Sequence, residues 1–86
     1  MGKYEKLLAK VMSGTADNNI AFDDLCWLLE RRGFEMRIKG GHYLFKFPSV
    51  RTLSLQRKGA GVKGYQVKQT RETLQQIAQS EKTENE

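Results

Sequence analysis

The chain contains very little of several residue types on which small proteins often depend. Its 86 residues include one cysteine, one histidine and one proline. A single cysteine cannot close an internal disulfide, and small secreted domains usually have several, so the sequence favours a reducing, cytoplasmic environment. One cysteine and one histidine also cannot supply a Cys/His zinc site within one chain. We therefore expect no metal site and no other cofactor.

Long hydrophobic runs are also missing. Hydrophobic residues make up 38% of the chain and charged residues 29%, which is ordinary for a soluble globular domain. No apolar run approaches the roughly 18 residues that span a membrane, and the basic N-terminus is not followed by the apolar stretch of a signal peptide. The sequence therefore predicts one small domain over residues 1–80, no membrane partner, and a disordered polar tail over residues 81–86.

Acidic residues are scarce over half of the chain. The whole sequence has 15 Lys or Arg against 10 Asp or Glu, but the segment 31–71 has eleven Lys or Arg and only Glu35, a net charge of +10. So much like charge on a small domain is typical of proteins that bind a polyanion, most often nucleic acid. An acidic protein partner is the alternative explanation of the same charge.

Three segments have the apolar spacing of amphipathic helices. They cover residues 4–12, 22–32 and 67–78, where apolar side chains recur every three or four positions. Gly14 and Gly33 follow the first two segments and suit the left-handed conformation that ends many helices. For the second helix we expect a Schellman-type stop.

Between the second and third helices the apolar period changes to that of strands. Alternation predicts strands over residues 35–39, 42–47 and 52–56, and Gly40-Gly41 is a hairpin signal. Residues 58–64 contain three glycines and are expected to form a mobile loop. The resulting order, α-α-β-β-β-α, predicts an α+β fold in which helices cover one face of a three-stranded antiparallel sheet.

Strand alternation also divides the candidate core from the candidate site. Tyr43, Phe45 and Phe47 fall on one face, which we expect to be the core, and His42, Leu44 and Lys46 fall on the other. Two other side chains that could take part in catalysis or binding are expected to be structural. We expect Cys26 to be a core residue rather than a nucleophile, and Trp27 to be a partly exposed packing residue.

His42 is the candidate catalytic residue. It follows two glycines, which allow a ligand to approach closely, and Lys46 and Lys39 are expected near it. Histidine side chains exchange protons near neutral pH, so an imidazole among cations can move a proton beside a phosphate. A lone histidine is a weak signal, and a surface histidine in a turn, with no chemical role, is the alternative.

The residues around His42 resemble a known family. The run Lys39-Gly40-Gly41-His42-Tyr43-Leu44-Phe45 is similar to the Gly-Ser-His segment of the HicA-type toxins, which are messenger-RNA interferases of bacterial toxin–antitoxin modules. Residues 22–34, 53–56 and 63–72 resemble the preceding helix, third strand and closing helix of that family. Two positions depart from the pattern, because Gly41 stands where the family usually has Ser and Gly64 where Pro is frequent.

The resemblance covers about residues 4–78 and has definite implications. It implies a fold like that of a double-stranded-RNA-binding domain, a catalytic role for His42, and a cytoplasmic toxin that cleaves mRNA and is neutralised by a HicB-like antitoxin. A non-catalytic RNA-binding domain of the same fold and an interaction module for an acidic protein are the alternatives. The residues expected to bind RNA are Arg37, Lys39, Gly40, Gly41, Lys46, Lys63, Lys68 and Arg71.

RNA cleavage requires few protein groups, because RNA carries its own nucleophile in the 2′-hydroxyl. A protein need only deprotonate this group, stabilise charge on the phosphorane and protonate the leaving 5′-oxygen, and no metal is required. His42 is the expected base, with nearby cations stabilising the phosphorane. The sequence leaves the acid open among a lysine, Tyr43, water and His42 itself.

Overall fold

The fold of the chain was obtained as a computed structural model, which describes residues 2–84 and the side chains of residues 2–81. Its order confirms the predicted α-α-β-β-β-α arrangement and adds one short hairpin, β4–β5. The elements are α1 (Lys3–Ser13), α2 (Phe22–Arg32), β1 (Glu35–Lys39), β2 (His42–Lys46), β3 (Leu53–Leu55), β4 (Arg57–Lys58), β5 (Gly61–Val62) and α3 (Gly64–Glu84).

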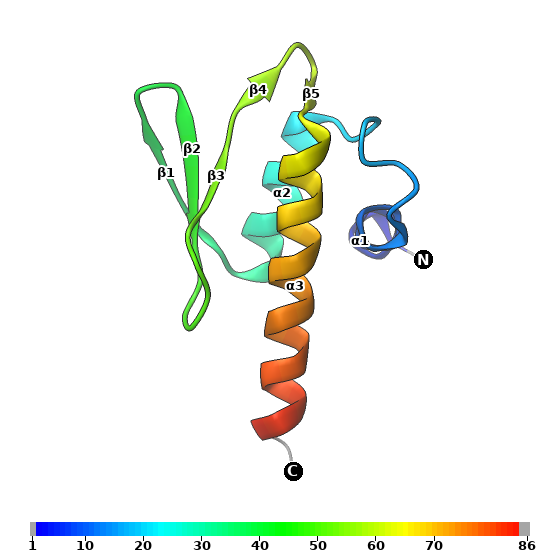
Figure 1. Ribbon diagram of the computed structural model, residues 1–86, viewed down its shortest axis with the longest axis vertical. Coiled ribbons are helices and arrows are strands. Elements are labelled where there is room, and N and C mark those ends of the chain that lie inside the picture. Colours follow the sequence, from blue (N-terminus) through cyan, green and yellow to red (C-terminus); the bar gives the residue numbers. More distant parts are fainter. Residues whose placement is uncertain (1, 85–86) are drawn as a thin grey trace.

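The elements form layers with the sheet on the outside (Figure 1). The sheet has the order β1-β2-β3, and both pairs of neighbours are antiparallel. Helices α2 and α3 lie against one face of it, and α1 packs on these two helices on the side away from the sheet (Figure 1). The opposite face of the sheet is left to solvent, so a side chain there is available to a ligand.

The helix ends follow the predicted chemistry. Gly14 and Gly33 have left-handed φ angles of 74° and 111°, which residues with a Cβ atom adopt at a cost. After α2, the Phe34 N–H donates to the Leu29 carbonyl at 3.0 Å and the Gly33 N–H donates to the Glu30 carbonyl at 3.1 Å. The Schellman-type stop is therefore confirmed, and it turns the chain from α2 directly into β1.

The two faces of β2 are divided as the alternation predicts. Phe45 is fully buried against the helices, and Tyr43 and Phe47 are half-buried and pack on the same core. His42 and Lys46 are exposed on the other side. We call the side of the sheet that carries His42 and Lys46 the outer face, and the side that carries Phe45 the inner face.

Residues 58–64 are not the mobile loop that their glycines suggest. Residues 57–58 and 61–62 pair as the hairpin β4–β5, and Val62 is buried. The hairpin is also attached to the start of α2, because the Phe22 N–H donates to the Ala60 carbonyl at 3.0 Å and Ala21 bridges to Gly61. The prediction was wrong because these partners lie about 40 positions earlier in the sequence and leave no local pattern.

The last helix is longer than predicted at both ends. α3 begins at Gly64 and continues to Glu84, so residues 81–84 are helical rather than a disordered tail, and residues 85–86 lie outside the described chain. Glu81 forms an ion pair with Arg32 at the end of α2, and the Glu and Lys residues of this segment are good helix formers. Among the helices of the described residues, none is long and apolar enough to cross a membrane.

Candidate functional site

His42 lies exposed on the outer face, directly after the glycine turn. Gly40 and Gly41 have φ angles of 54° and 82°, which fit the tight hairpin that reverses the chain before His42. The register pairs Lys39 with His42. Because directly paired residues project to the same side of a sheet, the Lys39 ammonium and the imidazole share the outer face.

Two side chains contact the imidazole, one from β3 and one from the residue just after it. Ser54 Oγ lies 3.3 Å from His42 Nδ1, and Gln56 Nε2 lies 3.5 Å from His42 Nε2. Neither residue was predicted to belong to the site. Alternation between Leu53 and Leu55 does place Ser54 on the outer face, but its proximity to His42 depends on the register between β2 and β3.

Three predicted cations gather on the same face as His42. The register pairs Arg37 with Leu44 and Glu35 with Lys46, so these side chains also project outward. Arg37 Nε lies 3.4 Å from Glu35 Oε1, but both side chains are about two-thirds exposed, and such pairs are weak. Among the side chains described for residues 2–81, Lys39 and Lys46 have no carboxylate oxygen within 4.0 Å. Their charges are therefore available to an anion.

Arg71 does not belong to this group. Its guanidinium donates two hydrogen bonds to the Asp17 carboxylate, at 2.8 and 3.1 Å, and a third to the Val11 carbonyl at 3.1 Å. The hydrogen bonds from Arg71 lower the pKa of the Asp17 carboxyl below its ordinary value of 3.8, although partial burial opposes this effect. Arg71 thus joins α3 to α1 and to the loop before α2, and we assign it a structural role instead of RNA binding.

The two remaining predicted lysines lie in α3 and just before it. The charge of Lys68 adds to the lowering of the Asp17 pKa, which places it on the Arg71 side of the helix. Lys63 precedes α3, and its Nζ lies 5.9 Å from the ring centroid of Tyr65. Among the described side chains neither lysine contacts His42, so the structure does not gather all the predicted RNA-binding residues into one cluster.

Gly64 lies close to the loop before α2. A Cβ atom on Gly64 would lie 2.6 Å from Asn18 Oδ1, closer than real side chains approach. The loop before α2 therefore approaches the start of α3 closely at this point. The contacting atom is the end of a flexible side chain, so a larger residue at position 64 would require the Asn18 amide to move.

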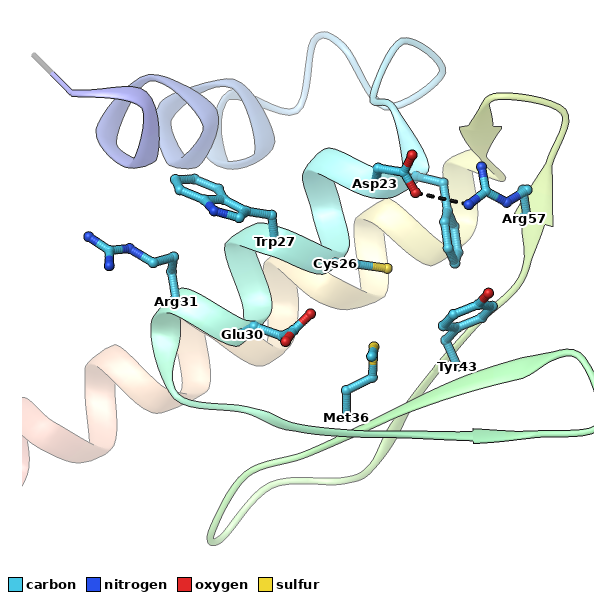
Figure 2. A pocket seen from close by; sticks show the side chains of 9 residues that line it. Asp23, Cys26, Trp27, Glu30, Arg31, Met36, Tyr43 and Arg57 are labelled. Atoms are coloured by element: carbon cyan, nitrogen blue, oxygen red, sulfur yellow. Dashed lines mark hydrogen bonds and ion pairs between the residues drawn. The ribbon is translucent and has the colours of Figure 1, made fainter.

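A separate pocket of about 430 Å³ opens between α2 and the inner face of the sheet (Figure 2). Met36 and Tyr43 project into it from the sheet, and the Tyr43 ring stands edge-on to Phe22 with centroids 4.8 Å apart. Tyr43 therefore points away from the outer face. This orientation removes it from the groups that could protonate a leaving oxygen beside His42.

Cys26 borders the same pocket and is not an activated thiol. Burial raises the pKa of Cys26 to about 11, and the carboxylates of Asp23 and Glu30 act in the same direction. A thiolate is the reactive form of cysteine, so Cys26 is inert at neutral pH. The prediction that it is a core residue is confirmed by its burial.

The outer face therefore offers one imidazole, two uncommitted lysines and an exposed arginine. Within residues 2–84, no group of three or more His, Cys, Asp or Glu side chains is arranged to hold a metal ion. Comparisons of the chain with protein-family models, with curated proteins and with solved structures found no match.

Proposed function

We propose that the protein is a metal-independent RNA endonuclease of the HicA type, the toxin of a type II toxin–antitoxin module, which cleaves mRNA in the cytoplasm and so blocks translation. The observation that supports this most directly is the pairing of His42 with Lys39 on the exposed outer face. It provides a proton-transfer group and a phosphate-binding group at adjacent positions. Lys46 and Arg37 extend the positive charge along the same face.

In the proposed reaction His42 acts as the general base. The imidazole takes the proton of the RNA 2′-hydroxyl, the 2′-oxygen attacks the adjacent phosphorus, and the bond from phosphorus to the 5′-oxygen breaks. Lys39, Lys46 and Arg37 stabilise the negative charge of the phosphorane. The leaving oxygen receives its proton from the imidazolium, from a lysine or from water, which leaves a 2′,3′-cyclic phosphate and a 5′-hydroxyl.

The contacts of His42 fit this role. Ser54 contacts Nδ1 of the imidazole, whereas Nε2 faces the Gln56 amide at the longer distance of 3.5 Å. Nε2 is therefore the nitrogen that can receive a proton from a substrate. A single acid–base group contributes roughly 10²–10⁴-fold to a rate, so we expect a slow nuclease. A slow nuclease is sufficient for a toxin when every message is a substrate.

The proposed antitoxin is a HicB-like protein with an acidic surface. A free cationic face would bind cellular RNA indiscriminately, and an acidic partner that covers His42 would prevent this. Complementary charge also speeds association, which favours rapid neutralisation of a toxin. RNA and antitoxin then compete for the outer face.

Incubation of the purified protein with single-stranded RNA, with and without EDTA, tests the proposed function. We expect cleavage in both conditions, with cyclic-phosphate and 5′-hydroxyl ends identified by mass spectrometry. Products with 3′-hydroxyl and 5′-phosphate ends, or loss of cleavage in EDTA, would contradict the mechanism. Salt-dependent RNA binding without cleavage would instead identify a non-catalytic RNA-binding domain.

A further inference from the structure

Gln66 is a buried polar side chain that reaches the strand behind the candidate site. It lies in the first turn of α3 and is only 4% exposed. Its Oε1 accepts a hydrogen bond from the Gln56 backbone N–H at 3.2 Å, and its Nε2 donates to the Ser54 carbonyl at 3.4 Å. One amide therefore bonds the backbone of both residues whose side chains contact the imidazole.

The chain of contacts continues to both ring nitrogens of His42. Ser54 Oγ is 3.3 Å from Nδ1, and the Gln56 side-chain nitrogen is 3.5 Å from Nε2. An amide nitrogen can only donate, so with this orientation Nε2 is the acceptor. Nδ1 of the neutral ring then carries the proton and donates a hydrogen bond to Ser54 Oγ. The contacts favour one of the two neutral tautomers of His42, the one with its lone pair on Nε2.

Burial makes Gln66 suited to hold this arrangement. Ser54 is exposed and Gln56 is only partly buried, so their side chains alone restrain the imidazole weakly. β3 ends at Leu55, so the backbone of Gln56 lies just beyond the sheet. A buried amide with both of its ends bonded stays in place, because breaking either bond leaves a polar group without a partner in a dry environment.

We propose that Gln66 is a positioning residue, which fixes the backbone at Ser54 in β3 and at Gln56 just after it, and thereby sets the orientation and tautomer of His42. Its importance for catalysis rests on the proposed function, because only then does the Nε2 lone pair take a proton from RNA. Its effect on the imidazole does not depend on that function and can be measured separately.

The variant Gln66→Met tests the proposal, with Thr70→Val as a matched control. Methionine has a similar length but removes both hydrogen bonds. Thr70 is also buried in α3, and its hydroxyl donates to the Gln66 carbonyl at 2.9 Å, so Thr70→Val removes a buried hydrogen bond that does not involve Ser54 or Gln56. The control separates a loss of stability from a loss of positioning.

The readout is the ¹⁵N spectrum of the imidazole at a pH where the ring is neutral. His42 is the only histidine in the chain, so its ring nitrogens give a single assignable set of signals. We expect the Nδ1-protonated tautomer to dominate in the wild type and in Thr70→Val. In Gln66→Met the signals should move toward those of an unrestrained histidine. RNA cleavage should then fall on the order of tenfold or more at unchanged RNA affinity, because a misplaced base reacts slowly.

An imidazole spectrum that is the same in Gln66→Met and the wild type would overturn the proposal, and so would an equal change in Thr70→Val. If Gln66→Met does not fold, Ser54→Ala at the exposed surface tests the contact between Ser54 and His42 Nδ1. Unchanged tautomer signals in Ser54→Ala would also overturn the proposal. A wild-type protein that cleaves no RNA would defeat the proposed function alone, since the spectrum still decides what holds His42.

Discussion

The protein keeps its basic side chains in two different settings. At the junction of α1 and α3, Arg71 is 15% exposed as a side chain and has a dedicated carboxylate in Asp17, whose side chain is 22% exposed. On the outer face of the sheet, Lys39 and Lys46 are exposed and have no carboxylate within 4.0 Å among the described side chains. The charges of Arg71 and Asp17 cancel, whereas Lys39 and Lys46 add to the net charge and have charge to offer a ligand.

The difference follows residue type as well as position. The four ion pairs of the described side chains all use an arginine, and three of them join segments that are distant in the sequence. The planar guanidinium suits such pairs because it donates several hydrogen bonds in a fixed geometry. Three of the six arginines of the sequence connect distant segments in this way, whereas Lys39 and Lys46 of the outer face have no ion pair among the described side chains.

Replacing the imidazole should have the largest effect on the outer face. We expect His42→Ala to reduce RNA cleavage by about 100-fold or more, since a general acid–base group is lost. The midpoint of thermal unfolding should change little, because His42 is exposed on the side away from the core. Cleavage of single-stranded RNA and circular dichroism measure the two properties. Wild-type cleavage by His42→Ala would remove this residue from the mechanism.

Charge reversal should show that the lysines of the outer face differ from other lysines. We expect Lys39→Glu/Lys46→Glu to weaken RNA binding by about tenfold or more and to flatten the dependence of affinity on salt. The control Lys6→Glu/Lys10→Glu makes the same change in net charge on exposed positions of α1. Fluorescence anisotropy over a range of salt concentrations measures both.

The same pair of variants tests how the antitoxin acts. If it covers the outer face, Lys39→Glu/Lys46→Glu should weaken its binding together with that of RNA. Antitoxin affinity that stays unchanged at low and high salt, while RNA binding is lost, would contradict direct competition. Inhibition would then come from another surface of the protein.

The Asp17–Arg71 pair should affect stability and not RNA binding. We expect Asp17→Asn to lower the midpoint of thermal unfolding at pH 7 and to leave RNA affinity unchanged. The folded state lowers the Asp17 pKa, so the ionised carboxylate stabilises the fold above its ordinary pKa of 3.8. This stabilisation is lost as the pH falls through the lowered value.

Unfolding midpoints of the wild type and Asp17→Asn should therefore converge as the pH falls below 3.8. A difference that stays constant over the whole range would mean that the charge of Asp17 is not what stabilises the junction. A change in the RNA affinity of folded Asp17→Asn in either direction would show that the Asp17–Arg71 junction takes part in RNA binding.

The smallest effect is expected at the glycine turn that presents His42. Gly41 has a φ of 82°, and a Cβ atom there would meet no other atom within 4 Å, so only backbone strain opposes a side chain. We expect Gly41→Ser to lower the free energy of unfolding by about 1 kcal/mol and Gly41→Asn by less, since asparagine tolerates this conformation. Urea denaturation measures both. Equal stability of Gly41→Ser and the wild type would contradict the φ angle of the turn.

Much of the fold could be predicted because it depends on patterns among residues that are close together in the sequence. Apolar spacing located α1, α2 and the three long strands, and the glycines at 33 and 40–41 marked the turns between them. Alternation in β2 placed His42 and Lys46 on one face and Phe45 on the other. These features depend on neighbours within a few residues, so they need no knowledge of the rest of the chain.

Contacts between distant segments were decided only by tertiary packing. Ser54 and Gln56 reach His42 from 12 and 14 positions away, and Arg71 reaches Asp17 from 54 positions away. The same kind of contact attaches the β4–β5 hairpin to α2 and supports α3 beyond residue 80. By itself the sequence determined the order of the elements and the face that carries His42. The packing of those elements selected which cations are neutralised and which side chains hold the imidazole, because hydrogen bonds and ion pairs form between whichever groups the folded chain brings together.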